Sequence, residues 1–171
     1  MLRNFDMQEL AAALDAARRA RSLSWVALAV EINRPFAGTH SIPISLNTVR
    51  GLRNKHSVTS AVILQILRWL RRTPESFLSG NIGVLQPSEK LPDPGPSRIL
   101  RFDTSAMYAA LNTERIKRNM TWREVATELP GFSESMLINL KTGPLIGFPR
   151  VMFITQWLNS PAARFVRDRS R

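Results

Sequence analysis

The sequence predicts an all-α protein that consists of two tandem helical bundles, of about five helices each, joined by a linker rich in proline and glycine. Three observations lead to this prediction. Apolar residues recur every three or four positions along most of the chain, as they do in amphipathic helices. The second half of the chain repeats the pattern of the first half. Between the halves, residues 79–97 contain four prolines and three glycines.

The first bundle begins with a helix that we predict over residues 7–21. Leu10 and Leu14 fall on one face of this helix. Asp6 precedes the helix and Glu9 follows three residues later, which is the spacing at which a side chain caps the first backbone N–H groups of a helix. Arginine residues close the segment and suit the negative end of its helix dipole.

Two further helices follow, with a loop between them. Ser24 is expected to cap a helix over residues 25–32, and Ser45 is expected to cap the next helix. Residues 33–44, which separate these helices, hold two prolines and a glycine, so we expect a loop there. The pattern therefore predicts a helix, a long turn and a second helix.

The first bundle ends with its most apolar segment. Residues 58–72 are predicted to form a central buried helix, because apolar residues cover one broad face of it. Pro74 then opens a short last turn that ends near Leu78. The linker follows, and its 19 residues span at most about 60 Å when fully extended.

An internal duplication is the strongest signal in the sequence. At an offset of 97 residues, ten of the 28 residues from 5 to 32 are identical in the second half, where chance gives roughly two. After the loop the offset falls to 88, which pairs Ser45 with Ser133 and Trp69 with Trp157. The difference of nine residues is an insertion in the loop of the first copy.

This duplication predicts the domain organisation. A first domain spans residues 1–78 and includes the long turn 33–44, a linker spans residues 79–97, and a second domain with a basic C-terminal tail spans residues 98–171. Both domains carry more basic than acidic side chains, and the whole chain has a net charge of +11 and a pI of about 11.5. A chain with this excess is expected to bind a polyanion.

Composition also excludes several classes of function. The chain has no cysteine, and its two histidines cannot form a zinc site by themselves, so we expect no metal and no cofactor. Residues at the spacing of a catalytic set or a phosphate loop are lacking, which predicts no enzyme and no small-molecule substrate. The N-terminal segment lacks the apolar stretch of a signal peptide, and the apolar run 61–67 is too short to cross a membrane. We therefore expect a cytoplasmic protein.

Residues 44–56 carry the pattern of a DNA-reading helix. Val49 and Leu52 lie three residues apart and are expected to face inward, which turns Asn47 and Arg50 outward. Amide groups and guanidinium forks pair with the edges of adenine and guanine in a DNA major groove. The alternative interpretation is an ordinary polar surface helix. The segments on either side favour the DNA-reading interpretation.

Each copy resembles the helix-turn-helix of the lambda-repressor-like family, which is also known as the Cro or Xre type. Ala126 stands at the fifth place after Thr121, where the family needs a small residue for close approach of its two helices. The resemblance implies two lambda-repressor-like helix-turn-helix bundles, in which the second helix of each pair enters the major groove and the first braces the backbone. The segments that carry the resemblance are 24–32 and 45–54 in the first copy, and 121–129, 130–132 and 133–143 in the second.

The resemblance also implies which residues contact DNA. In the first copy they are Ser45, Leu46, Asn47, Thr48, Arg50, Arg53, Asn54, Lys55 and His56. In the second copy they are Ser133, Glu134, Ser135, Ile138, Asn139, Lys141 and Thr142. There Glu134 could accept a hydrogen bond from cytosine and Ile138 could touch a thymine methyl group, but a carboxylate also repels phosphates. Base reading by the second copy stays open beside a dimer-forming or backbone-only role.

The leading hypothesis is a sequence-specific transcriptional regulator, a repressor or an activator, that binds double-stranded DNA as a covalent pseudo-dimer. A second copy of the chain, or RNA polymerase, is a further partner that such a regulator could contact. Two other hypotheses stay open: a recombination directionality or architectural factor that bends DNA, and a protein-binding regulator that contacts another transcription factor. The resemblance implies a bacterial, nucleoid-associated protein. The insertion could act as an arm that touches DNA or a partner.

Overall fold

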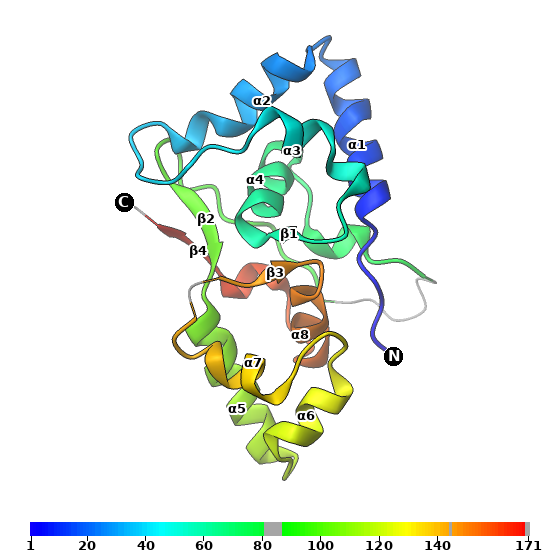
Figure 1. Ribbon diagram of the computed structural model, residues 1–171, viewed down its shortest axis with the longest axis vertical. Coiled ribbons are helices and arrows are strands. Elements are labelled where there is room, and N and C mark those ends of the chain that lie inside the picture. Colours follow the sequence, from blue (N-terminus) through cyan, green and yellow to red (C-terminus); the bar gives the residue numbers. More distant parts are fainter. Residues whose placement is uncertain (81–86, 144, 170–171) are drawn as a thin grey trace.

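The computed structural model describes residues 1–80, 87–143 and 145–169. Helices, including short 3-10 helices labelled η, make up most of the described chain, and two small sheets join them (Figure 1). The first copy contains α1 (Met7–Ala20), α2 (Trp25–Asn33), η1 (Arg34–Phe36), α3 (Leu46–Arg50), η2 (Leu52–Asn54), β1 (Val58–Thr59), α4 (Ser60–Leu70) and η3 (Pro74–Phe77). The second copy contains β2 (Ile99–Phe102), α5 (Thr104–Lys117), α6 (Trp122–Glu128), α7 (Glu134–Asn139), β3 (Gly147–Phe148), α8 (Val151–Trp157), η4 (Ala162–Phe165) and β4 (Val166–Arg169).

Three predicted helix starts of the first copy are confirmed. The side chains of Asp6, Ser24 and Ser45 cap α1, α2 and α3, because each accepts a hydrogen bond of 2.9 to 3.1 Å from the backbone N–H three residues later. The helix predicted over residues 58–72 is shorter than expected. Its first two residues are extended as β1, and it ends before Arg71, which adopts a left-handed φ of 56°.

The all-α prediction is wrong, because the fold is mixed and the described residues form two antiparallel two-stranded sheets. β1 pairs with β3, and β2 pairs with β4. These strands are two to four residues long, which is too short to leave a periodic signal in the sequence. Each sheet supplies partners for backbone groups that would otherwise be buried without them. Part of the segment predicted as a basic tail forms β4 over Val166–Arg169, and residues 170–171 of that tail lie outside the described residues.

The β1–β3 ribbon relates the two copies by an approximate twofold axis. Val58 pairs with Phe148, and Thr59 pairs with Gly147. The offset of 88 makes Gly147 the counterpart of Thr59, so the second pair joins equivalent residues of the two copies. An antiparallel ladder centred on equivalent residues is the contact that a twofold axis produces in a symmetric dimer. Here both partners belong to one chain.

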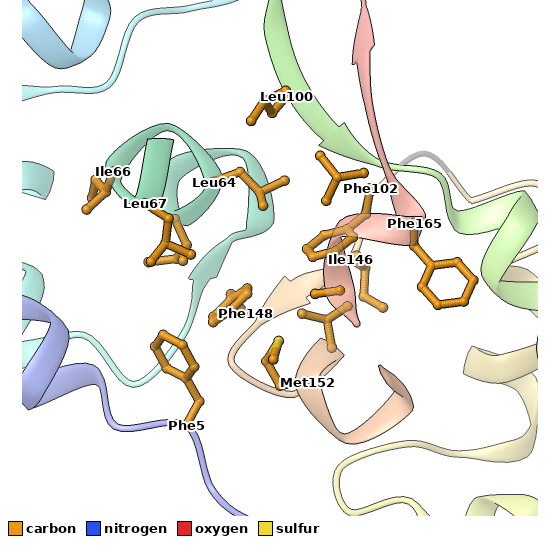
Figure 2. Packing of buried hydrophobic residues seen from close by; sticks show 14 of the residues in the cluster. Phe5, Leu64, Ile66, Leu67, Leu100, Phe102, Ile146, Phe148, Met152 and Phe165 are labelled. Atoms are coloured by element: carbon orange, nitrogen blue, oxygen red, sulfur yellow. The ribbon is translucent and has the colours of Figure 1, made fainter. Parts of the chain in front are cut away.

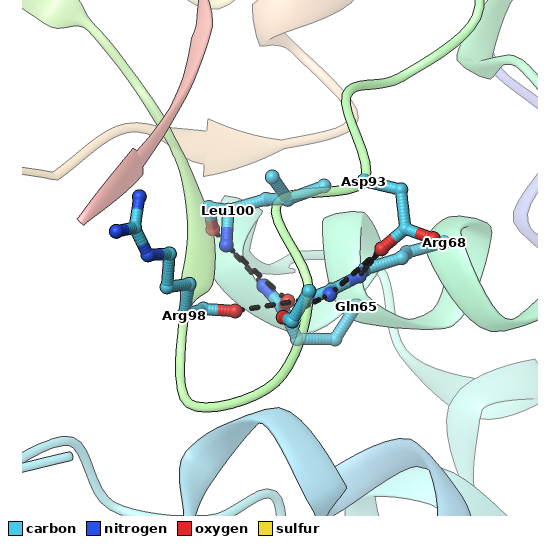
Figure 3. A network of polar contacts seen from close by, with 6 residues as sticks. Gln65, Arg68, Asp93, Arg98 and Leu100 are labelled. Carbon is cyan, nitrogen blue, oxygen red and sulfur yellow. Dashed lines mark hydrogen bonds and ion pairs between the residues drawn. The ribbon is translucent and has the colours of Figure 1, made fainter. Parts of the chain in front are cut away.

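Two glutamines make equivalent contacts between the copies, although they are not equivalent to each other at the offset of 88. On α4, the Gln65 amide donates to the carbonyl of Leu100 at 3.0 Å and accepts from the N–H of Leu100 at 3.3 Å (Figure 3). On α8, the Gln156 amide makes the same two bonds with Arg3, at 2.9 and 2.8 Å. Leu100 is the counterpart of Arg3 at the offset of 97. Each copy thus holds the segment that precedes the first helix of the other copy.

Buried apolar residues of both copies form one continuous cluster. The ring of Phe148, from β3, packs edge-on against the ring of Phe5, with 4.6 Å between the ring centroids. Figure 2 shows side chains such as Leu64 of α4, Phe102 of β2 and Met152 of α8 gathered in the same region. The relative position of α3 and α7 is therefore set by a shared core as well as by the β1–β3 ribbon.

The described part of the linker lies against α4 and is held there by Arg68. The Arg68 guanidinium donates to the Asp93 carboxylate at 2.9 and 3.2 Å and to two backbone carbonyls further along, at 2.7 and 2.8 Å (Figure 3). The hydrogen bond from Arg68 lowers the pKa of Asp93. Residues 87–97 are therefore attached to the first copy, whereas residues 81–86 of the predicted linker lie outside the described residues.

A cluster of arginine, tryptophan and glutamate recurs in both copies and ties α2 to α4 in the first copy and α6 to α8 in the second. In the first copy, the Arg21 guanidinium lies 4.4 Å from the ring centroid of Trp69, and the indole N–H donates to Glu31 at 2.8 Å. The corresponding distances in the second copy are 4.3 and 2.7 Å, between Arg118, Trp157 and Glu128. All three residue types are identical at the two offsets.

Candidate nucleic-acid interface

The short helices α3 and α7 occupy equivalent places in the two copies. Ser45 and Ser133 cap them, and each serine accepts a hydrogen bond from the backbone three residues later, at 3.1 and 3.2 Å. Val49 and Leu137, which are equivalent at the offset of 88, are buried and anchor the helices. The β1–β3 ribbon lies between α3 and α7 in Figure 1. The two helices therefore flank the approximate twofold axis.

Almost all side chains that the sequence predicts to contact DNA are exposed to solvent. In the first copy the exposed residues are Ser45, Leu46, Asn47, Arg50, Arg53, Asn54, Lys55 and His56, and Thr48 is half-buried. In the second copy the exposed residues are Ser133, Glu134, Ser135, Ile138, Asn139, Lys141 and Thr142. The fold thus gathers each set on one short helix and the turn that follows it.

The nine-residue insertion does not separate α2 from α3. Asn33, the last residue of α2, donates to the carbonyl of Ile44 at 2.8 Å and accepts from the N–H of Ile44 at 2.7 Å. This pair closes the loop at its base, so residues 34–43 leave and return at the same point. Ala29, at the small-residue position of the helix pair, is buried. α2 and α3 therefore stay in contact despite the insertion.

The insertion extends toward the second copy. Phe36 is buried, and the Ser41 hydroxyl accepts a hydrogen bond of 3.1 Å from Arg101 of β2. Figure 1 shows the insertion beside β2. Ile42 has an exposed fraction of 89 %. The insertion thus bridges the copies, while the expectation that it touches DNA or a partner stays a prediction.

Basic side chains surround α3 and the turn after it. A groove of about 590 Å³ lies between α1 and α3, and its cationic residues are Arg19, Arg50 and Arg53. A second groove of about 490 Å³ borders the turn, where Arg53, Lys55 and His56 face the start of the chain. These two grooves place four cationic side chains and one histidine around one short helix.

The groove beside α1 also contains the carboxylate of Asp15. Arg18 and Arg19 bind this carboxylate at 2.7 and 2.9 Å. The hydrogen bond from Arg18 is the main reason why the pKa of Asp15 lies below its ordinary value. The carboxylate is therefore ionised and already neutralised by α1, which leaves Arg50 and Arg53 on the opposite wall exposed to solvent.

The outer face of α7 differs in chemistry from that of α3. Glu134 lies in the first turn of α7, where α3 has Leu46. Ile138 has an exposed fraction of 39 % and stands where α3 has Arg50. Lys141 follows the helix and lies 5.9 Å from the ring centroid of Tyr108. The second copy thus has the carboxylate of Glu134 where the first has the apolar side chain of Leu46. It has the apolar side chain of Ile138 where the first has the guanidinium of Arg50.

Comparison with protein-family models, curated proteins and solved structures finds no match to this chain. The resemblance to the lambda-repressor-like family therefore depends on the residues and helix pairs described above. Within residues 1–80, 87–143 and 145–169, no helix is both long enough and apolar enough to cross a membrane. The same described segments hold no group of three or more histidine and carboxylate side chains placed to bind a metal ion.

Proposed function

We propose that this protein is a sequence-specific transcriptional regulator that binds double-stranded DNA, and that its two copies act as a covalent pseudo-dimer. The observation that carries this proposal is the placement of α3 and α7. Both helices are capped by serine, anchored by one buried apolar residue and exposed to solvent on their outer face, and they flank an approximate twofold axis. The DNA backbone has local twofold symmetry, so two related helices can meet two stretches of major groove.

The charge of the molecule supports this proposal. The net charge is +11, and Arg50, Arg53 and Lys55 are exposed on α3 and the turn after it. Basic side chains supply the affinity for a phosphate backbone, which does not depend on sequence, and groups that reach base edges supply the specificity. α3 and its surroundings offer both kinds of group.

Within this proposal, the N-terminal part of α3 enters the major groove. Asn47 and Arg50 read base edges, because amides and guanidinium groups form paired hydrogen bonds with adenine and guanine. Arg53, Lys55 and His56 bind phosphates, and α2 braces α3 from behind. Such a regulator acts in a bacterial cytoplasm, on the nucleoid.

Fluorescence anisotropy with a duplex selected from a random library tests the proposal. Neutralisation of about six phosphates predicts that the logarithm of the association constant falls with the logarithm of salt concentration with a slope near −5. A slope near zero on the selected duplex would contradict DNA binding through these side chains.

Three variants separate base reading from charge. Arg50→Ala is expected to weaken binding to the selected duplex about 5- to 150-fold, which corresponds to the loss of one paired base contact. Arg50→Lys keeps the charge but loses the planar fork, so it should bind a scrambled duplex normally and the selected duplex weakly. Lys90→Ala removes an exposed charge from the linker, beside the end of α4, and is the matched control. Equal losses in Lys90→Ala and Arg50→Ala would mean that net charge alone determines binding.

A further inference from the structure

We infer that the DNA site of this protein is not a palindrome but a pair of unlike half-sites at a fixed separation, and that one chain binds it in one direction. This inference rests on the proposed function and concerns the sequence that the two helices read. It follows from two observations. The backbones of the two copies are arranged almost symmetrically, but the exposed side chains of α3 and α7, here called the reading surfaces, are not symmetric.

The frame of the two copies is nearly symmetric. Thr59 and Gly147, which are equivalent residues, pair at the centre of the β1–β3 ribbon. Beside this pair, the backbone N–H of Ser60 donates to the carbonyl of Ile146 at 3.2 Å. The serine caps and the buried residues of α3 and α7 are also equivalent. The fold therefore offers the two halves of a bound duplex the same backbone in two opposite orientations.

The reading surfaces break this symmetry at the exposed positions. At the offset of 88, Glu134 is the counterpart of Leu46, and Ile138 is the counterpart of Arg50. The counterpart of Asn47 is Ser135, which carries a hydroxyl in place of an amide. All of these side chains are exposed. Cationic character is retained only after the helices, where the two positions are occupied by Arg53 and Lys141.

These differences change the bases that each helix prefers. Arg50 and Asn47 suit guanine and adenine, whereas Glu134 suits the amino group of cytosine and Ile138 suits the methyl group of thymine. A palindrome presents identical base edges to both helices, so one of them would meet bases that do not suit it. A mismatched base pair typically weakens binding about 5- to 150-fold. The best site must therefore differ between its halves.

The separation of the half-sites is set by the fold and not by the linker. Gln65 and Gln156 fasten each copy to the other, and Arg68 holds the described end of the linker against α4. The two copies therefore cannot move relative to each other to fit a different separation of the half-sites. Insertion of about five base pairs between the half-sites turns one of them to the opposite face of the duplex and should reduce affinity to that of a single half-site.

Selection of duplexes from a random library by the full-length protein tests this inference. Native mass spectrometry of the complex counts the chains on each duplex, so that a symmetric site occupied by two chains is recognised. The expected result is one chain on two unlike motifs with constant spacing and constant relative orientation. A palindrome bound by one chain would overturn the inference, and so would a single half-site, which would mean that α7 contacts a protein or only the DNA backbone.

A variant that copies α3 onto α7 provides the matched experiment. The changes Glu134→Leu, Ser135→Asn and Ile138→Arg are all at exposed positions, so the thermal unfolding midpoint should stay close to that of the original protein. This variant should select an inverted repeat of the motif that the first copy reads. Ile138→Arg alone should move the second motif part of the way. An unchanged second motif in both variants would overturn the inference.

The two proposals fail in different ways. If no sequence is enriched from the library and the salt dependence is absent, the proposed function fails and the inference fails with it. If a palindrome that is bound by one chain, or one half-site, is enriched with a steep salt dependence, the proposed function stands and only the inference is lost.

Discussion

At the residue scale, two glutamines do the work that strand partners do elsewhere. The Gln65 side chain is only 1 % exposed, and its amide satisfies both backbone groups of Leu100. Its N–H group also donates to the carbonyl of Ala61, one turn earlier on α4, at 2.9 Å. A buried amide with all of these partners is stable in a core, and it fixes the distance between the copies because each bond has a defined length.

Replacing the buried glutamine should destabilise the protein strongly. Gln65→Ala leaves the N–H and carbonyl of Leu100 unpaired, and each costs about 1–3 kcal/mol, so the free energy of unfolding should fall by roughly 2–6 kcal/mol. Gln156→Ala is the matched variant. Gln156 is only half-buried, so water can reach the backbone of Arg3 and the loss should be smaller. Urea unfolding measures the free energy of unfolding of both variants. Equal losses would contradict the expectation that the more buried glutamine contributes more to stability.

A buried carboxylate predicts a dependence of stability on pH. Glu75 is 7 % exposed and lies where the copies meet. One of its oxygens accepts from the N–H of Ala162 at 2.6 Å, and the other has no hydrogen-bond partner within the described segments. Burial raises the pKa of the Glu75 carboxyl, and the hydrogen bond from Ala162 offsets only part of this effect. The folded state therefore favours the protonated form of Glu75 more than the unfolded chain does.

The sign of the effect follows from linkage. Because the pKa is higher in the folded state, stability is greatest below the pKa of the unfolded chain and is lost as the pH rises through the folded value. The glutamine of Glu75→Gln does not titrate. Relative to this variant, the original protein should therefore lose free energy of unfolding between about pH 4 and about pH 8. Urea unfolding at both pH values measures the difference, and a constant difference would mean an unshifted carboxyl.

At the element scale, α3 depends on its surroundings. It has five residues, which is far too few for a helix that is stable by itself. The Ser45 cap, the buried Val49 and the pair between Asn33 and Ile44 hold it against α2. The insertion can therefore grow in length without moving α3, because its ends are joined at the base.

Opening this base should loosen the insertion and α3 together. Asn33→Ala removes the partners of both backbone groups of Ile44, and the free energy of unfolding should fall by about 1–3 kcal/mol. Amide hydrogen exchange should become faster over residues 34–44 and at the start of α3. Ser41→Ala is the control, since it removes only the contact with Arg101 and should cost about 0.5 kcal/mol or less. Unchanged exchange in Asn33→Ala would show that the buried residues alone hold the loop.

At the scale of the whole molecule, the two copies behave as partners in a dimer that happen to share a chain. Their buried apolar residues form one cluster, and Glu75, Gln65 and Gln156 each bond across the boundary between them. Neither copy can unfold without exposing apolar surface and unpaired backbone groups of the other. This coupling is what gives α3 and α7 a defined separation.

Unfolding should therefore be a single cooperative transition. Each copy contains two tryptophans, so a variant with Trp25→Phe and Trp69→Phe reports on the second copy, and a variant with Trp122→Phe and Trp157→Phe reports on the first. In each variant the fluorescence midpoint should coincide with the midpoint from far-ultraviolet circular dichroism. Two separated midpoints would mean that the copies fold independently, as the predicted domain division implies.

Local features of this fold are predictable from the sequence because their physical causes are local. The caps at Asp6, Ser24 and Ser45 act within one helical turn, so the helix starts agree with expectation. The duplication is also visible, because equal residues recur at constant offsets. Those identities include the cluster of arginine, tryptophan and glutamate. Its arginine and glutamate recur at the offset of 97 and its tryptophan at the offset of 88, and this recurrence is the signal that could have revealed the cluster. The two sheets and the glutamine contacts have no such signal.

The sequence by itself determined the capped helices, the duplicated pattern, the insertion and the positive charge, since each depends on residues that are near neighbours or recur at a constant offset. Only the tertiary structure decided that the copies join through the β1–β3 ribbon, that Gln65 and Gln156 cross between them, and that the linker lies on α4. The physical reason is that these contacts satisfy backbone groups and apolar faces that become unpaired only when the two copies meet. Local sequence preferences carry no information about these contacts between the copies.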